Sequence, residues 1–141
     1  MRVEKLSGGR MMLNDSYNAN PQSMEAALRT LAGVPAAKRI AFLGDMKELG
    51  DATEKGHKDM GRLAAELGID ILLCTGPFCR AYMLPAAKES GLADVRWYEK
   101  KEDAYDDLVH LFGENCALLL KGSHFANRLD LAADYLRTYQ F

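Results

Sequence analysis

The feature that most constrains the fold is an alternation of short hydrophobic runs with amphipathic helical stretches. The hydrophobic runs comprise residues 39–43, 69–74, 95–98 and 117–120, and the helical stretches comprise residues 53–67, 78–89, 102–112 and 129–139. Strands without polar alternation that are joined by helices are typical of a parallel sheet covered on both faces. We therefore predict an α/β fold, Rossmann-like and doubly wound, with a mostly parallel sheet of about six strands.

Two β-like runs, Arg2–Leu6 and residues 10–14, precede this alternation. Ser7-Gly8-Gly9 between them is a turn sequence, so the two runs predict an N-terminal hairpin. A helix is expected over residues 23–31, with Pro21 in its first turn, where a missing N–H is tolerated. The 141 residues contain no visible linker or internal repeat, and we expect one domain over residues 1–141.

Composition narrows the classes of partner. A net charge of −2 and a pI near 5.9 offer no basic surface for nucleic acid or an anionic membrane. No apolar run could span a bilayer and no signal peptide is visible, so a cytoplasmic protein is expected. Cys74, Cys79 and Cys116 suit neither a disulfide framework nor a metal site, and reduced, partly buried thiols are expected.

In an open α/β sheet, ligands bind beyond the carboxyl ends of the strands. Four loops follow predicted strands and cover residues 15–20, 44–50, 75–78 and 121–127. In the first loop, Asn20 precedes a helix and is equally suited to cap it or to contact a ligand. Capping does not account for Asp15, Tyr17 and Asn18, which are therefore candidate ligand-binding residues.

The loop that begins at Lys121 has the composition of an anion site. A lysine at the end of a buried strand points toward the crevice, and Ser123 supplies a hydroxyl near a helix start, where the helix dipole favours negative charge. The alternative interpretation is a solvated lysine and a serine that caps the helix. His124, which follows directly, is a further possible contact.

Asp45 and His57 are also possible site residues, with weaker signals. Asp45 follows the strand over residues 39–43 and could hold a ligand amine or cap a turn. His57 falls on the polar side of the predicted helix over residues 53–67, where a lone histidine is more often a surface residue than a catalyst.

Several motifs of complete enzymes are missing from the sequence. We find no G-x-G-x-x-G dinucleotide fingerprint after the first parallel strand, no G-x-x-x-x-G-K-[ST] phosphate loop, no G-x-S-x-G elbow and no metal-spaced Cys/His cluster. The residues alone therefore predict a binding half-site, with no catalytic residue and no metal site in this chain.

Three motifs resemble those of the C-terminal domain of the Mur ligase family, in the branch that adds D-alanyl-D-alanine. Residues 14–21, N-D-S-Y-N-A-N-P, resemble the family's D-D-S-Y-N-A-N-P, and residues 43–50 resemble its L-G-D-M-x-E-L-G. Residues 121–123 match its K-G-S. Two positions depart from the pattern, because Asn14 replaces the first aspartate of the motif and His124 stands where the family often has arginine.

The resemblance implies a three-domain ligase that acts on peptidoglycan precursors. Such an enzyme uses ATP to form an acyl phosphate on UDP-N-acetylmuramoyl-tripeptide, and the amine of D-alanyl-D-alanine then attacks it. N-terminal and central domains outside this sequence would hold the UDP sugar, Mg²⁺ and most of the ATP. The present domain, inactive alone, would bind the dipeptide and close over the nucleotide.

The same resemblance implies roles for individual residues. Arg2 and Asp15 would contact ATP, Tyr17, Asn18 and Asn20 would line the space between nucleotide and dipeptide, and Lys121 and Ser123 would bind the dipeptide carboxylate. Two alternatives stay open, namely a Mur ligase that adds a single amino acid and an autonomous Rossmann-like small-molecule binding module. Met1 is expected to mark a cut at a domain boundary rather than a natural start.

Overall fold

A six-stranded sheet forms the middle layer of the computed structural model, which describes residues 1–141 apart from the side chain of Phe125. The strands are β1 (Arg2–Leu6), β2 (Arg10–Asp15), β3 (Arg39–Gly44), β4 (Ile71–Thr75), β5 (Asp94–Tyr98) and β6 (Ala117–Lys121). Their order across the sheet is β1-β2-β6-β3-β4-β5, in which only the β1–β2 pair is antiparallel. This arrangement confirms the predicted fold class and the N-terminal hairpin.

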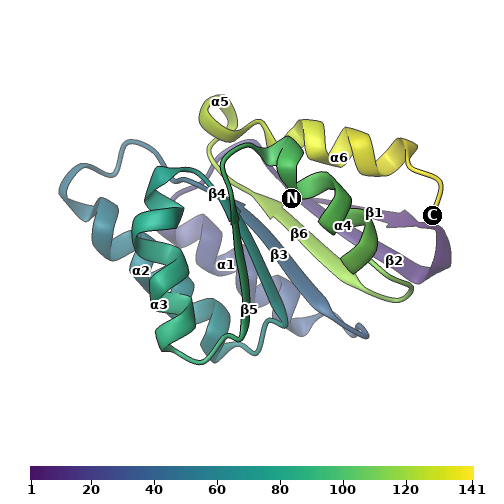
Figure 1. The fold of residues 1–141 in the computed structure, drawn as a ribbon, viewed down its shortest axis with the longest axis horizontal. Helices are drawn as coiled ribbons and strands as arrows, with labels where there is room; N and C mark the ends of the chain where they lie inside the picture. The colour runs from purple at the N-terminus through teal and green to yellow at the C-terminus, as the bar shows by residue number, and fades with distance from the viewer.

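Helices cover both faces of the sheet (Figure 1). They are α1 (Pro21–Gly33), α2 (Thr53–Glu66), α3 (Leu84–Glu89), α4 (Tyr105–Leu111), α5 (His124–Asn127) and α6 (Leu129–Thr138). Side chains alternate along each strand, so that Ala41 and Leu43 of β3 pack with α1, α2 and α3, whereas Ile40 and Phe42 pack with α4 and α6. The continuous hydrophobic strands of the sequence are therefore explained by burial on two sides.

Several boundaries differ from those expected. Asp15 and Lys121 are the last residues of β2 and β6 and lie opposite each other in the parallel register, although Asp15 was expected in a loop. Strand β4 begins at Ile71, two residues later than predicted, and the short helix α5 was not predicted. A 3-10 turn, Lys101–Ala104, replaces the first turn of the helix expected over residues 102–112.

The helix expected over residues 78–89, which contains Pro85, is divided into two parts. Residues Cys79–Met83 form a π-helical turn, and α3 then begins with Pro85 in its first turn. Because proline has no N–H to donate and its ring crowds the preceding turn, the helical segment widens into the π turn directly before it. The three cysteines form no disulfide and are all buried, more completely than the partial burial expected from the sequence. Across the described chain, no helix combines the length and apolar character of a membrane span.

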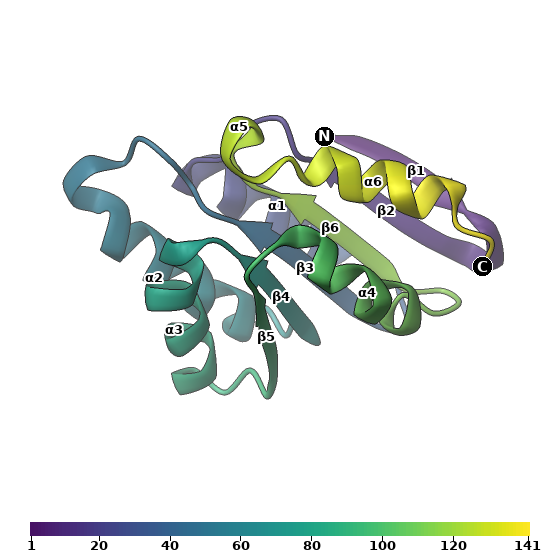
Figure 2. The same cartoon turned by 45° about the horizontal axis from the view of Figure 1, so that its top comes forward.

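The topology creates a crevice at the carboxyl end of β6. The chain leaves β2 and β3 toward helices on one face of the sheet and leaves β6, which lies between them, toward α6 on the other face. Diverging connections of neighbouring strands open a space in which ligands bind. In Figure 2, α5 and the segment that leaves β2 lie side by side at this end of the sheet.

Candidate functional site

A cleft of about 560 Å³ lies at the carboxyl ends of β2, β6 and β3. Its lining comes from the loops after these three strands and comprises Tyr17, Asn18, Lys47, Glu48, Ser123, His124 and Ala126. The structure therefore brings together three of the four loops selected from the sequence. Tyr17 is 79% exposed, and the centre of its ring lies 5.6 Å from that of His124, so the two aromatic side chains meet across the cleft.

Lys121 is buried beneath this cleft and its ammonium is already engaged. Nζ donates to Oδ2 of Asp15 at 2.7 Å and to the carbonyl oxygen of Asn18 at 2.8 Å. The lysine is 1% exposed, whereas the Asp15 side chain is 22% exposed. The pair ties the loop after β2 to the end of β6. Binding of a dipeptide carboxylate by Lys121 stays a prediction, and such a ligand would compete with these two partners.

The loop after β2 is ordered by its own polar side chains. Oδ1 of Asn20 accepts a hydrogen bond from the Ser23 N–H at 2.8 Å, and Oγ of Ser23 accepts one from the Asn20 N–H at 3.1 Å. This reciprocal pair is a capping box at the start of α1. Asn20 therefore caps the helix, which was one of its two predicted roles, and any contact with a ligand would be additional.

The loop after β3 is fixed by three consecutive backbone N–H groups that each donate to a side chain. Asp45 donates to Oδ1 of Asn127 at 3.3 Å, Met46 to Nε2 of His57 at 3.0 Å, and Lys47 to Oγ of Ser123 at 3.0 Å. Ser123 makes no side-chain bond to the start of α5, so it does not cap that helix. Its hydroxyl instead holds the loop that forms the opposite wall of the cleft.

The carboxylate of Asp45 organises the next loop along the sheet. It is 1% exposed and accepts hydrogen bonds from the N–H groups of Phe78 at 3.2 Å and Cys79 at 2.8 Å. Gly76 lies against it with φ +106°, where an added Cβ would come within 2.4 Å of the carboxylate. Of the two interpretations of Asp45, the structure shows the turn-capping one.

His57 is fully buried, and the expectation of a surface position was wrong. Its Nε2 accepts the N–H of Met46, which assigns the ring proton to Nδ1 and makes Nδ1 the donor to the Thr53 carbonyl at 2.7 Å. Burial lowers the pKa of His57 below its ordinary value of 6.5, so the neutral form is favoured. The helical pattern misplaced this residue because α2 packs beneath the loop after β3, which covers the side that sequence alone treats as exposed.

Asp45, His57 and Cys79 place one ligand-type atom each within 4.8 Å of one another. The carboxylate and both ring nitrogens are occupied by hydrogen bonds to Phe78, Met46 and other backbone groups. Burial raises the pKa of the Cys79 thiol well above its ordinary value, which disfavours the thiolate that metals bind. This cluster is therefore a buried hydrogen-bond network that supports the loops.

Asn127 is the main structural residue that sequence reasoning did not single out. Its side-chain amide donates to the carbonyl oxygens of Asp45 at 2.8 Å and Ser123 at 3.1 Å, and its Oδ1 accepts the Asp45 N–H. Gly44 and Gly122 make room for it, since a Cβ on either would come within 3 Å of the amide. The glycines at both strand ends were the available signal for this close packing.

Lys47 and Glu48 line the cleft and were also missed as site residues. Nζ of Lys47 lies 3.7 Å from Oδ2 of Asp45 and 4.7 Å from the centre of the Phe78 ring. A second hollow of about 300 Å³ contains Arg2, Asn14 and Asp15, and Tyr17 lines both hollows. Arg2 and Asp15, the predicted ATP contacts, thus share one hollow that adjoins the cleft.

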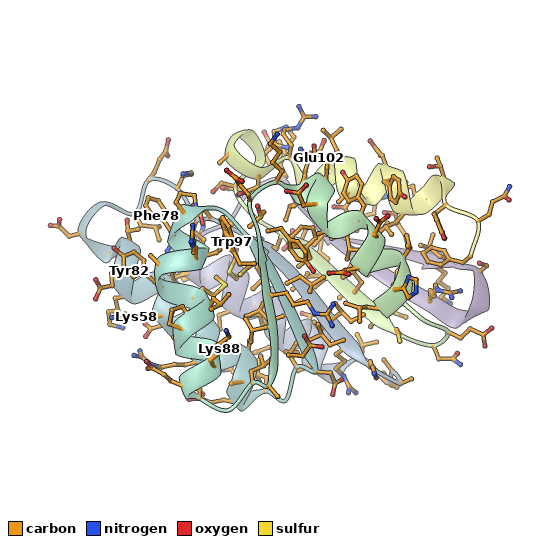
Figure 3. All side chains as sticks on the ribbon, viewed as in Figure 1. Lys58, Phe78, Tyr82, Lys88, Trp97 and Glu102 are labelled. Atoms are coloured by element: carbon orange, nitrogen blue, oxygen red, sulfur yellow. The ribbon has the colours of Figure 1, made fainter. Side chains whose placement is uncertain are left out.

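A further hollow of about 530 Å³ lies at the carboxyl ends of β4 and β5. Trp97 lines it, donates from Nε1 to the Gly76 carbonyl at 2.8 Å, and carries the guanidinium of Arg80 4.8 Å from its ring centre. Figure 3 shows Phe78 and Trp97 toward the carboxyl ends of the parallel strands, whereas Lys88 lies toward the other edge of the sheet, where these strands begin. Gly76 and Pro77 of the loop over residues 75–78 line this neighbouring hollow, and the described lining of the cleft includes no residue of that loop.

Comparison with known proteins identifies the domain. The sequence-family model described as the Mur ligase, glutamate ligase domain, matches residues 1–124. A UDP-N-acetylmuramoyl-tripeptide–D-alanyl-D-alanine ligase of Bacillus subtilis is 29% identical over 141 residues, which are 98% of this chain and 31% of the relative. The enzyme of the same name from Rickettsia prowazekii is 31% identical over 122 residues, which are 86% of this chain and 26% of the relative.

Solved structures agree with this comparison. MurF from Acinetobacter baumannii aligns with a TM-score of 0.80 at 31% identity, covering 94% of this chain and 29% of that one. The MurF ligase of Thermotoga maritima in complex with ADP aligns with a TM-score of 0.77 at 21% identity over 96% of this chain and 29% of that one, which shows a shared fold. The chain spans under a third of the length of these relatives. It belongs to the Mur ligase family, as the C-terminal, glutamate ligase domain.

Proposed function

We propose that this chain is the amine-binding and closure domain of an ATP-dependent ligase that joins D-alanyl-D-alanine to UDP-N-acetylmuramoyl-tripeptide. The observation that carries the proposal is the cleft at the end of β6, which is lined by residues of all three motifs that resemble the dipeptide-adding branch. It presents an ammonium, a carboxylate and hydroxyl groups on Lys47, Glu48, Ser123 and Tyr17. A dipeptide zwitterion needs acceptors for its ammonium and donors for its carboxylate.

The second hollow supports a place for the nucleotide beside the dipeptide. Arg2 offers a guanidinium there, and Asp15 offers a partly exposed carboxylate that could accept a ribose hydroxyl. A single guanidinium is a weak match for three phosphates, and the sequence has no phosphate loop. The phosphates and Mg²⁺ would therefore be held by a central domain outside this sequence.

The contribution of this chain to the reaction would be positioning. Because Tyr17 lines both hollows, a dipeptide in the cleft would lie next to a nucleotide in the second one. Holding an amine against an acyl phosphate converts a bimolecular step into an effectively intramolecular one. Closure of the domain would also exclude water, which otherwise hydrolyses the acyl phosphate.

The test exchanges domains with a relative. Residues 1–141 replace the C-terminal domain of the Bacillus subtilis ligase, and ADP release is measured with UDP-N-acetylmuramoyl-tripeptide and either D-alanyl-D-alanine or D-alanine. We expect turnover that depends on the dipeptide, and none from the 141-residue chain alone. Turnover with the single amino acid would favour a different Mur ligase activity, and ATP hydrolysis by the chain alone would overturn the proposal.

A second measurement covers the case in which the exchanged domain fits poorly. Amide spectra of the 141-residue chain are recorded during titration with D-alanyl-D-alanine and, separately, with D-alanine. Shift changes at Tyr17, Lys47 and Ser123 that saturate for the dipeptide alone support the proposal. Tight binding of a nucleotide by the isolated chain would instead indicate an autonomous binding module.

A further inference from the structure

Glu48 is held in a backbone conformation that residues other than glycine rarely adopt. Its φ is +63°, in the left-handed region, where contact between Cβ and the backbone costs free energy. Such strain persists only where the surroundings fix the chain, and it is concentrated at functional sites. The strained backbone at Glu48 must therefore be imposed by its surroundings, and it suggests that Glu48 has a role in the function of the cleft.

The cause is the way the loop after β3 is fastened on both sides of Glu48. The N–H groups of Asp45, Met46 and Lys47 are each bound by a side chain, and the Met46 side chain is fully buried. On the other side, Leu49 packs against the same hydrophobic cluster as Met46. With Met46 and Leu49 directed inward, the two residues between them are exposed and line the cleft.

Glu48 contributes the carboxylate in the lining of the cleft. Among the described residues, no hydrogen bond or ion pair involves its side chain. The nearby carboxylates are occupied, since Asp15 binds Lys121 and Asp45 binds the N–H groups of Phe78 and Cys79. A cationic group that enters the cleft would therefore find Glu48 as its unpaired counter-charge.

We propose that Glu48 binds the ammonium group of the incoming amine substrate and so selects a nucleophile with a free amino terminus. This inference rests on the proposed function for the identity of the substrate, because the cleft itself specifies only a small molecule with a cationic end. The left-handed backbone at Glu48 directs the carboxylate into the cleft. The neighbouring ammonium of Lys47 does not pair with this carboxylate, because it contacts Asp45 and the ring of Phe78 instead.

The test compares Glu48→Gln and Glu48→Gly with the matched control Asp51→Asn, an exposed acid that does not line the cleft. Binding of D-alanyl-D-alanine and of N-acetyl-D-alanyl-D-alanine to the 141-residue chain is followed by amide chemical shifts. We expect wild type and Asp51→Asn to prefer the free amine. Both Glu48 variants should bind it about tenfold more weakly, as loss of one charge-assisted hydrogen bond predicts, and lose the preference.

Stability separates this role from a structural one. Glu48→Gly relieves the left-handed strain and should unfold at a temperature at least as high as wild type, so weakened binding by this variant cannot come from unfolding. Unchanged affinity in Glu48→Gln would overturn the Glu48 proposal while leaving the proposed function intact. Binding of a single amino acid but not the dipeptide, still sensitive to Glu48→Gln, would overturn the proposed function alone. Failure of wild type to bind any of these amines would overturn both.

Discussion

Replacement of Lys121 by methionine tests whether the buried lysine serves the loop or a ligand. Methionine preserves most of the side-chain volume, so the change removes the ammonium without a large cavity. Two interactions are lost, the 2.7 Å pair with Asp15 and the 2.8 Å hydrogen bond to the Asn18 carbonyl. If Lys121 fixes the loop after β2, the variant should be much less stable even without ligand.

The magnitude follows from the exposure of the partner. Breaking a fully buried ion pair by removing one partner costs about 3–5 kcal/mol, because the other charge is left uncompensated. The Asp15 side chain is 22% exposed and keeps part of its hydration, which lowers the cost, whereas the unpaired Asn18 carbonyl adds about 1 kcal/mol. We expect Lys121→Met to reduce the free energy of unfolding by about 3 kcal/mol, measured by urea denaturation.

A double-mutant cycle with Asp15→Asn provides the control. Asp15→Asn alone leaves a buried ammonium without its counter-charge, and we expect a loss of about 2 kcal/mol. The double variant should be less destabilised than the sum of the two single variants by about 2 kcal/mol. Additivity within about 0.5 kcal/mol would refute this reasoning, because it would mean that the two side chains do not stabilise each other. Loss of dipeptide binding without loss of stability would instead favour the predicted ligand role of Lys121.

Three further predictions concern buried residues that fix the loops of the cleft, and each is tested by measuring the free energy of unfolding. Asn127→Ala should cost about 3 kcal/mol, because two carbonyls and one N–H lose their buried partner, and a loss below about 1 kcal/mol would contradict this. Gly44→Ala should cost at least about 2 kcal/mol, since its Cβ would come within 2.4 Å of Cγ of the locked Asn127, whereas Gly33→Ala, with open space around it, should be neutral or stabilising. Because the pKa of His57 is lowered in the folded state, the unfolded state takes up its proton first as pH falls below 6.5. The free energy of unfolding should therefore decline as the pH falls below that value. His57→Gln should be less stable than wild type at pH 7, but its free energy of unfolding should decline less steeply with falling pH. The same pH dependence in wild type and His57→Gln would be evidence against the lowered pKa.

The parallel sheet was predictable because its strands are buried on both faces. Runs such as Ala117–Lys121 carry no polar alternation until their last residue, and this pattern has few other interpretations. The loops of the cleft were predictable for a related reason, since carboxyl ends of parallel strands meet at one edge. The order of strands across the sheet, which places β6 between β2 and β3, is a long-range property that local patterns do not encode.

The details of the site were less predictable because they depend on partners distant in sequence. Lys121 was expected to reach toward a ligand, yet its partner Asp15 is 106 positions away and becomes its neighbour only through the β2–β6 register. His57 was placed on a polar helix face, although the loop after β3 covers it. Pairing across the sheet decides which polar side chains are used for structure and which are left for ligands.

This division explains how the cleft can hold a charged group on a strained loop. Three buried polar residues, Asp45, His57 and Asn127, bind backbone groups of neighbouring loops. Their side chains are therefore already hydrogen-bonded in the absence of a ligand. A satisfied buried network is rigid, because each broken bond would leave an unpaired group in a low dielectric. That rigidity holds Glu48 in its left-handed conformation, with its carboxylate at the surface and without a partner among the side chains that the structure describes. It follows that weakening the network, for example by Asn127→Ala, should reduce amine binding through Glu48 even though Asn127 does not line the cleft.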